Sequence, residues 1–459
     1  MKIKNIIYIG YLLLSGCTLD IPLEDQFSDP DAITDVASAR SLLASAYESM
    51  PQYIYEFSLL SDDFYPSSKL EKDANMQNIY RWQVTGLVQL AGTLWNGYYQ
   101  TVANVNTLLA RMKNVVTVDE AGTKAAAEIT AQAKALKAWC YFDLLRLFAP
   151  RYIGNENADG IILKDQVELD YLPRSSVKVC VAEIRRLLTE AAGVENQPDK
   201  VYWMSDKAIA YLRVELELYA GNYPEVILLT KNLETDYPKE VLGTSDYTAL
   251  WSTDDSQARI FAKYQLALIF HDVVYSEYVD GDYLVLNDEI TYEEEDIRKE
   301  WSVYPFIMDN SRQVRLFGKY NRMNRESIKS CYVNYMRVAG LYLMRAEALA
   351  RTSQTGAREL MDTYLKQRGC QALTPEIQGE TLINRIWEER RKEFIGEGVR
   401  FFDLKRIGSQ DLKRYGRYGT GAITTIRTDD YRWTLPVPAS EYRYNELVTQ
   451  NAGWEKVML

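Results

Sequence analysis

The stretch RRKEFIGEGVRFFDLKRIG, residues 390–408, says more about the fold than any other part of the chain. Residues 387–394, which overlap its beginning, have a helical pattern in which acids and bases stand about one turn apart, such as Glu389 with Lys392 and Arg390 with Glu393. Pairs at this spacing face each other on a helix and stabilise it. The pattern therefore predicts a helix that ends just after Glu393.

A turn follows this helix. Gly396 and Gly398 flank Glu397, and because glycine adopts positive φ without strain, the two glycines allow the chain to reverse sharply. Phe401 and Phe402 then provide apolar area for packing. We interpret the whole stretch as part of the architecture of the protein.

Two other interpretations of this stretch can be compared with that one. A phosphate-binding loop would need more glycines, a preceding strand and a Lys-Ser/Thr ending, none of which is present. A catalytic pair of carboxylates, Glu393 and Glu397, would make the protein a carboxylate-only hydrolase. This second alternative stays open at the level of the sequence.

Composition and charge exclude several classes of function. The chain has 459 residues and a net charge of −11, so a nucleic-acid partner, which needs clustered Lys and Arg, is not expected. With His271 as its single histidine, the chain cannot form a zinc site with several imidazoles. A Ser-His or Cys-His nucleophile could be built only around this residue. We expect neither a metal ion nor another cofactor.

The amino terminus, MKIKNIIYIGYLLLSGC, has the pattern of an export signal. A basic start precedes an apolar run, residues 6–14, that is too short to span a bilayer. The following LSGC resembles a bacterial lipoprotein cleavage box, in which the cysteine is acylated. We therefore predict a signal peptide at residues 1–16, lipidation of Cys17 and a single body over residues 17–459.

Most of this body has a helical pattern. The segment AAAEITAQAKALKAWCYFDLLRLFAP is rich in helix-forming residues and ends at Pro150. Residues 206–233 and 335–369 each predict two helices joined by a glycine-containing turn, which resembles a tetratricopeptide unit. We therefore predict an all-α fold in which helix pairs form a scaffold.

Four cysteines besides Cys17 could pair in three ways in an exported protein. Cys140 and Cys180 lie in helical, largely apolar patterns, which favours buried free thiols. Cys331 and Cys370 have no spacing that indicates a metal site.

Several motifs together resemble the SusD/RagB family of outer-membrane lipoproteins. They are the stretch at residues 390–408, WTLPVPASEYRYNELVTQNAGW at residues 433–454, YLMRAEALAR, AKALKAWCYFDLLRLFA and the lipoprotein cysteine. They follow the family's order from Cys17 to Trp454, so the resemblance covers nearly the whole chain.

The resemblance implies a mainly α-helical fold with four tetratricopeptide-like units on one side and irregular, ligand-binding loops on the other. It implies a lipid-anchored protein on the outer surface of the outer membrane of Bacteroidetes-type bacteria. Such a protein captures oligosaccharides or polysaccharides and delivers them to a SusC-like TonB-dependent transporter, and it is not an enzyme. The alternatives are capture of oligopeptides by the same architecture, a carboxylate-only hydrolase, and a protein that serves assembly alone.

Residues 51–82 and 244–325 have weak helical periodicity and many aromatic and acidic residues. Sugars stack their C–H faces on aromatic rings and bond to polar side chains around them. On composition and location, we predict that the ligand contacts Tyr65, Tyr80, Trp82, Tyr275, Tyr278, Tyr283, Tyr292 and Trp301. For each ring the alternative is packing beneath a loop. VDGDY, around Asp280, could be a calcium turn but is more typical of an ordinary turn.

Overall fold

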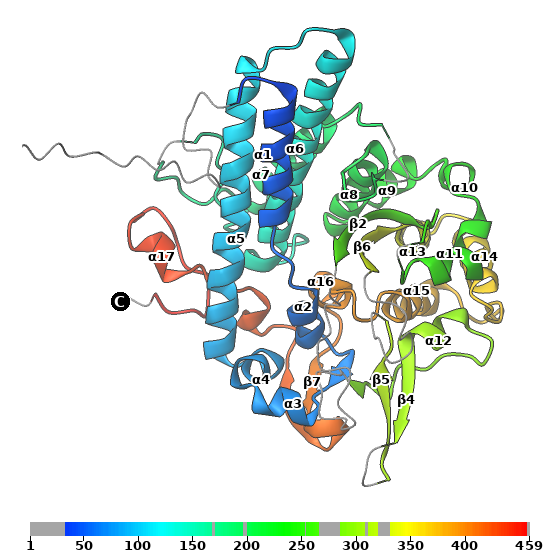
Figure 1. The fold of residues 1–459 in the computed structure, drawn as a ribbon. Coiled ribbons are helices and arrows are strands. Elements are labelled where there is room, and N and C mark those ends of the chain that lie inside the picture. Colours follow the sequence, from blue (N-terminus) through cyan, green and yellow to red (C-terminus); the bar gives the residue numbers. More distant parts are fainter. Residues whose placement is uncertain are drawn as a thin grey trace, which may run out of the picture.

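The computed structural model consists mainly of helices, which form two groups on opposite sides of the molecule (Figure 1). It describes residues 33–167, 170–195, 200–252, 254–265, 285–307, 311–319 and 331–456. The first group contains long helices that pack side by side: α1 (Val36–Ser49), α5 (Val84–Arg111), α6 (Glu120–Phe148) and α7 (Val177–Glu190). The second group contains shorter helices: α8 (Asp206–Tyr219), α9 (Tyr223–Leu229), α13 (Val338–Arg351), α14 (Ala357–Gln367) and α15 (Gly379–Glu393).

Helix α6 shows how local sequence sets these boundaries. The Asp119 side chain accepts the backbone N–H of Gly122 at 2.7 Å and caps the first turn. The helix ends two residues before Pro150, as the sequence predicted. At this end the ammonium group of Lys405 donates a hydrogen bond to the carbonyl oxygen of Ala149 at 2.8 Å. Burial lowers the pKa of Lys405 to about 7.

The two predicted helix pairs are confirmed as α8 with α9 and α13 with α14. Gly221 turns the chain between the first two helices at a φ of 69°, a value that favours glycine. The two pairs also contact each other, because Arg345 in α13 donates to the carbonyl oxygen of Thr230, just after α9, at 2.5 Å. The fold is mainly α-helical, in agreement with the sequence.

The two stretches of weak periodicity contain more regular structure than their pattern indicated. Residues 51–82 form α2 (Ile54–Leu60), β1 (Phe64–Tyr65), α3 (Ser68–Lys72) and α4 (Ala74–Tyr80). The described part of residues 244–325 forms α11 (Thr244–Ala249), β2 (Arg259–Gln265), β3 (Val285–Leu286), α12 (Ile297–Ser302), β4 (Val303–Ile307) and β5 (Gln313–Phe317). Elements of two to seven residues are too short to produce a clear period, which explains the difference.

Three small antiparallel sheets connect these elements. One has the order β1-β3-β5-β4, and therefore joins the two stretches of weak periodicity. The others pair β2 with β6 (Cys331–Arg337) and β7 (Leu412–Tyr415) with β8 (Ala422–Ile426). Helix α16 (Val399–Ile407) lies near the middle of the view in Figure 1 and contacts α2. The short helices α10 (Leu233–Asp236) and α17 (Ala439–Tyr442) complete the set of α-helices in the described part.

A continuous hydrophobic core connects the two groups of helices. Trp139 of α6 packs edge-to-face against Phe261 of β2, with 5.3 Å between the ring centroids. Cys140 and Cys180 are buried free thiols, as the pattern favoured, and Cys370 is a free, half-buried thiol.

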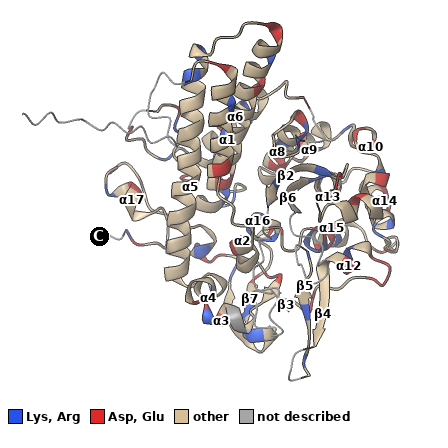
Figure 2. Ribbon diagram, in the orientation of Figure 1, with Lys and Arg blue, Asp and Glu red and all other residues tan. Residues whose placement is uncertain are grey.

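Charged residues of both signs are mixed over the ribbon (Figure 2). None of the helices in the described part is long and apolar enough to cross a membrane.

Candidate functional site

Five of the eight predicted ligand-binding aromatic residues lie in the described part of the chain, and their rings are packed within the fold. Tyr65, Tyr80, Trp82 and Trp301 are buried, and Tyr292 is half-buried. Trp82 is fully enclosed, and a ring covered on both faces cannot stack on a sugar.

Hydrogen bonds hold several of these side chains in place. The indole N–H of Trp82 donates to the carbonyl oxygen of Leu60 at 3.2 Å, and its ring packs edge-to-face on Trp433 at 4.6 Å. The hydroxyl of Tyr292 donates to the carbonyl oxygen of Lys392 at 3.0 Å. The sequence suggested exposed rings, and these five are instead part of the packing. Ligand contact at these positions stays a prediction that would require their neighbours to move.

Other predicted features lie outside the described residues. They are the aromatic positions Tyr275, Tyr278 and Tyr283, the turn around Asp280, and the lipidation position Cys17. The side chain of Cys331 is also outside the described set.

The stretch at residues 390–408 contributes two glutamates to a buried ionic centre. We use this name for Glu393, Glu397, Arg337, Arg368 and Lys319. Glu393 accepts hydrogen bonds from Arg337 at 2.6 Å and from Arg368 at 2.8 Å, and Glu397 accepts from Lys319 at 2.8 Å. Burial alone would raise the pKa of Glu393, but the charges of Arg368 and Arg337 outweigh it and hold the pKa well below its usual range.

This geometry agrees with an architectural role for the stretch. Gly396 and Gly398 adopt φ values of 71° and 74°, as the sequence predicted. The predicted pair of Arg390 with Glu393 is wrong, because Arg390 bonds to Asp403 across the turn at 2.7 Å. Glu393 is turned toward cations on other elements, which local spacing does not reveal.

The ionic centre does not fit the proposed carboxylate pair of a hydrolase. A general acid or nucleophile must reach the substrate, whereas Glu393 is 0% exposed and Glu397 is 7% exposed. Both carboxylates are already occupied by basic partners.

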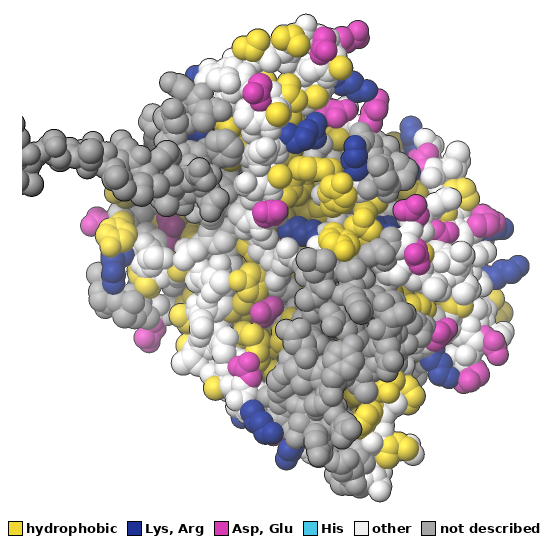
Figure 3. Space-filling view, in the orientation of Figure 1, with side chains coloured by type: hydrophobic (Ala, Val, Ile, Leu, Met, Phe, Trp, Pro, Cys, Tyr) yellow, Lys and Arg dark blue, Asp and Glu magenta, His cyan; other side chains and the backbone are white. Residues whose placement is uncertain are grey.

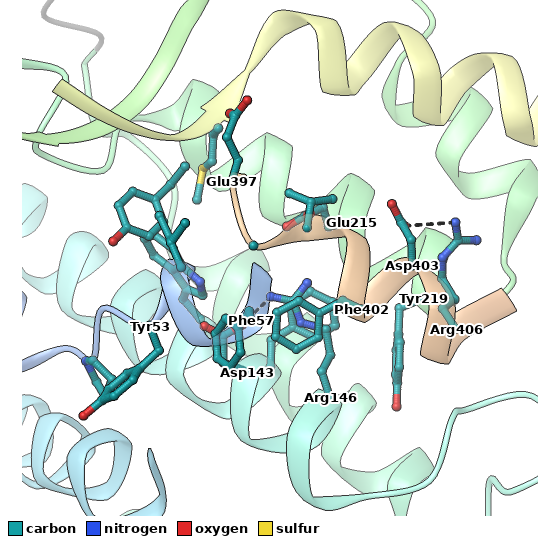
Figure 4. A pocket seen from close by; sticks show the side chains of 18 of the residues that line it. Tyr53, Phe57, Asp143, Arg146, Glu215, Tyr219, Glu397, Phe402, Asp403 and Arg406 are labelled. Atoms are coloured by element: carbon teal, nitrogen blue, oxygen red, sulfur yellow. Dashed lines mark hydrogen bonds and ion pairs between the residues drawn. The ribbon is translucent and has the colours of Figure 1, made fainter. Parts of the chain in front are cut away.

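A small pocket of about 100 Å³ lies beside α16 and is lined by further charged residues (Figure 4). Asp143 and Arg146 of α6 form an ion pair there, and Asp403 pairs with Arg406 of α16 at 3.3 Å. Burial raises the pKa of Glu215, which lines the same pocket. The space suits a few water molecules and is small beside ordinary ligand pockets of about 300–1,000 Å³.

A much larger cleft, about 990 Å³ in volume, lies between the long helices and the second group. Figure 3 shows hydrophobic side chains in this region, over the part of the surface where α1 and α6 face α8 and β2, with charged side chains around them. We call this the aromatic cleft. Its walls come from α1, α6, residues 200–207, the connection 236–246 and the segment 255–260.

Two neighbouring aromatic side chains, Tyr202 and Trp203, line the aromatic cleft. Their ring centroids are 6.1 Å apart. Tyr202 is 39% exposed and Trp203 is half-buried. Tyr47 packs edge-to-face on Trp203 at 5.1 Å, and the guanidinium of Arg40 lies 6.0 Å from the same ring. The ring of Trp203 is thus supported from α1, while Tyr202 remains accessible to a ligand.

Polar groups complete the aromatic cleft. Gln132 of α6 is 3% exposed and lines the cleft, and its side-chain oxygen accepts no hydrogen bond within the part of the chain that the structure describes. A buried acceptor without a donor is unfavourable, so a ligand hydroxyl that reached it after a small rotation would gain a hydrogen bond. The carboxylate of Asp246 already accepts a hydrogen bond from the backbone N–H of Gln257 at 2.6 Å. Among the described residues, no group of His, Cys, Asp and Glu side chains could hold a metal ion.

Sequence reasoning missed Tyr202 and Trp203. The pair lies in the connection between α7 and α8, residues 191–205, whereas the sequence-based prediction was confined to the two long stretches of weak periodicity. Two adjacent aromatic residues in a connection between helices are the signal that could have found them, since such connections run over the surface of a protein.

Comparisons with known proteins extend this picture. Two family models match consecutive parts of the chain: one described as "Starch-binding associating with outer membrane", over residues 24–212, and one described as "SusD family", over residues 259–454. The chain belongs to the SusD/RagB family. No curated protein sequence matches it.

Solved structures show the same fold as this SusD/RagB protein. A SusD superfamily protein from Bacteroides thetaiotaomicron matches with a TM-score of 0.75 and 20% identity, covering 91% of this chain and 99% of its own. A SusD-like carbohydrate binding protein from Bacteroides vulgatus matches with a TM-score of 0.75 and 17% identity, covering 91% and 98%. Surface glycan-binding protein A from Bacteroides fluxus matches with a TM-score of 0.70 and 19% identity, covering 91% and 99%.

Proposed function

We propose that this SusD/RagB protein captures oligosaccharides at the cell surface and that the aromatic cleft is where it holds them. Two family models support carbohydrate binding and association with the outer membrane, through the words "Starch-binding associating with outer membrane" and the match to SusD. The observation that carries the choice of site is that two groups line the same cleft: the accessible ring of Tyr202, and the amide oxygen of Gln132, which accepts no hydrogen bond from any described residue.

The chemistry of the cleft matches that of a sugar. An aromatic ring offers a flat apolar face to sugar C–H groups, and the amide oxygen accepts a hydroxyl proton. The charged residues that line the cleft are of both signs, and several of them are already engaged, such as Glu195 with Lys124. A neutral saccharide therefore fits better than a strongly charged one. Weak, reversible contacts of this type also permit release to a transporter.

In this proposal the protein acts without catalysis, is held to the outer membrane through acylated Cys17, and passes its ligand to a SusC-like TonB-dependent transporter. Replacement of Cys17 by Ser should release the protein from the membrane fraction and abolish acyl labelling. Co-purification of a large transporter with the tagged wild-type protein from its native membrane would support the handover. A reducing-end assay that detected product release from a bound polysaccharide would contradict the absence of catalysis.

Affinity electrophoresis through gels that contain different polysaccharides tests the site. The wild-type protein should be retarded by at least one neutral polysaccharide. Tyr202→Ala should reduce its affinity about tenfold, because it removes a stacking contact of roughly 1–1.5 kcal/mol. Tyr444→Ala is the matched control, since Tyr444 is 70% exposed and lies outside the cleft.

The outcomes separate the alternatives. Unchanged retardation of Tyr202→Ala would show that the sugar binds elsewhere. An absence of retardation in a broad panel, together with a peptide that co-purifies with the protein, would favour capture of oligopeptides.

A further inference from the structure

A second groove, about 530 Å³ in volume, lies between α15 and α16. One wall carries Asn384, Trp387 and Arg391, which are three to four residues apart and so share one face of α15. Arg400 of α16 and the following Ser409 and Gln410 line the groove as well. Its volume lies within the range of about 300–1,000 Å³ that is common for ligand pockets.

The charges of this groove are already paired. Arg400 donates two hydrogen bonds to the carboxylate of Asp62, at 2.8 and 2.9 Å, and Arg391 donates to Asp63 at 3.1 Å. Gln410 donates its amide N–H to the same Asp62 at 3.2 Å, which leaves its amide oxygen available. Arg391 also donates to the backbone carbonyl oxygen of Asp62 at 2.6 Å, so Asp62 positions three groups of the groove, and the engaged guanidinium groups offer little to an anion. The two acids that line the groove are paired as well: Glu380 lies 3.8 Å from Arg351, and Glu388 lies 3.4 Å from Lys392.

The remaining polar groups of the groove are open. Asn384 and Ser409 are exposed, and their side chains make no hydrogen bond in the part of the chain that the structure describes. Trp387 is half-buried, and its indole N–H has no acceptor among the described residues. The guanidinium of Arg351 lies 4.8 Å from the centroid of the Trp387 ring and holds it from outside the groove.

A partly exposed indole, an amide and a hydroxyl, in a groove whose charges are neutralised, form the set that binds a hydroxyl-rich neutral molecule. We propose that this groove is a second saccharide-contact site, independent of the aromatic cleft, which binds a neutral stretch of two or three sugar units. The ligand class rests on the proposed function, whereas the site does not. Two separate contacts on one protein would raise its avidity for a long polysaccharide that spans both.

Titration of the indole N–H resonances of ¹⁵N-labelled protein tests this proposal. The resonance of Trp387 is identified by its loss in Trp387→Phe, which keeps an aromatic ring of similar position. The probes are maltotriose, cellotriose and mannotriose, with trigalacturonate and trialanine as charged and peptide comparisons. We expect at least one neutral trisaccharide to shift the Trp387 resonance with a Kd of about 1 mM, and to do so equally in the cleft variant Tyr202→Ala.

Variants of the groove test its polar groups. The double variant Asn384→Ala with Ser409→Ala should weaken the trisaccharide at least about fivefold, since it removes two hydrogen-bonding side chains. Gln354→Ala removes an exposed amide elsewhere and should change nothing. If Trp387→Phe failed to fold, calorimetric titration of wild type and the double variant with the same trisaccharides would carry the test, because Asn384 and Ser409 are exposed and their substitution should not disturb the fold.

Three results would overturn the proposal: no shift of the Trp387 resonance with any neutral trisaccharide, a shift that disappears in Tyr202→Ala, or an equal shift with trigalacturonate or trialanine. If only the proposal for the groove is wrong, polysaccharide should still retard the wild-type protein in the gel. Tyr202→Ala should still reduce that retardation. Failure of the proposed function would remove that retardation, so the two failures can be distinguished.

Discussion

The buried ionic centre and the aromatic cleft differ in whether their buried polar groups have hydrogen-bond partners. In the ionic centre, Glu393 is fully enclosed and accepts from Arg337, Arg368 and the hydroxyl of Tyr364. In the aromatic cleft, the amide oxygen of Gln132 is equally hidden but accepts no hydrogen bond from any described residue.

The difference separates groups that stabilise the fold from groups that can bind. A buried charge persists only when it is paired, so the ionic centre holds together α15, the turn after it and β6. An unpaired polar group lowers stability and is retained where a ligand supplies its partner. An acceptor without a donor among the described residues therefore distinguishes the aromatic cleft from the ionic centre.

The largest effect is expected in the ionic centre. Glu393→Gln removes a negative charge that faces Arg337 and Arg368, and loss of one partner of a buried ion pair costs about 3–5 kcal/mol. Urea denaturation should show this decrease in the free energy of unfolding. Glu388→Gln, on the exposed side of the same helix, is the control and should change it by less than about 0.5 kcal/mol. A small effect of Glu393→Gln on the free energy of unfolding would contradict the stabilising role of the ionic centre.

A pair of aromatic substitutions sharpens the comparison. Trp82→Ala should destabilise the protein by about 3 kcal/mol, because it leaves a cavity next to Trp433 and Phe401. Tyr202→Ala should lower stability far less and weaken saccharide binding instead. Thermal unfolding and gel retardation of both variants measure the two effects. Loss of saccharide affinity in a folded Trp82→Ala protein would support the ligand contacts predicted from the sequence.

Glu56 in α2 tests how partial burial of a carboxylate affects stability. Burial raises its pKa to about 7 from 4.5, so the folded protein keeps this proton where the unfolded chain has lost it. The stability from this group is complete below pH 4.5 and falls as the pH rises toward 7. Between pH 5 and pH 8, the free energy of unfolding of Glu56→Gln should therefore increase by about 1 kcal/mol relative to that of wild type.

Urea titrations at several pH values measure this difference. Glu48→Gln, at an exposed position of α1, is the matched control, and its free energy of unfolding should change with pH as that of wild type does. Parallel pH profiles for Glu56→Gln and wild type would contradict the raised pKa.

The smallest effect belongs to the aromatic cleft. Gln132→Met keeps the length of the side chain and removes the unpartnered oxygen, so the free protein should become more stable by about 0.5–1 kcal/mol. Saccharide affinity should fall several-fold at the same time, because a hydrogen bond to the ligand is lost. Calorimetric titration and urea denaturation of the same sample check both. A variant that lost stability without losing affinity would assign Gln132 to the fold.

The amino-acid sequence by itself determined the fold class, the helix pairs and the family. Capping at Asp119, the stop at Pro150 and the glycines at 396 and 398 are local signals, and they act in the structure as their neighbours in the chain indicate. The family motifs at residues 133–149, 342–351 and 390–408 lie within such helices and turns, which is why they could be recognised without knowledge of any contact.

Only the tertiary structure decided which rings are open and which charges are paired. Trp82 is enclosed by Trp433, which is distant in the chain, and Arg390 takes Asp403 rather than the nearby Glu393. The short strands of residues 51–82 and 285–317 form one sheet through pairing that leaves no periodic pattern. Burial depends on what packs over a side chain from elsewhere, and composition carries no information about that partner.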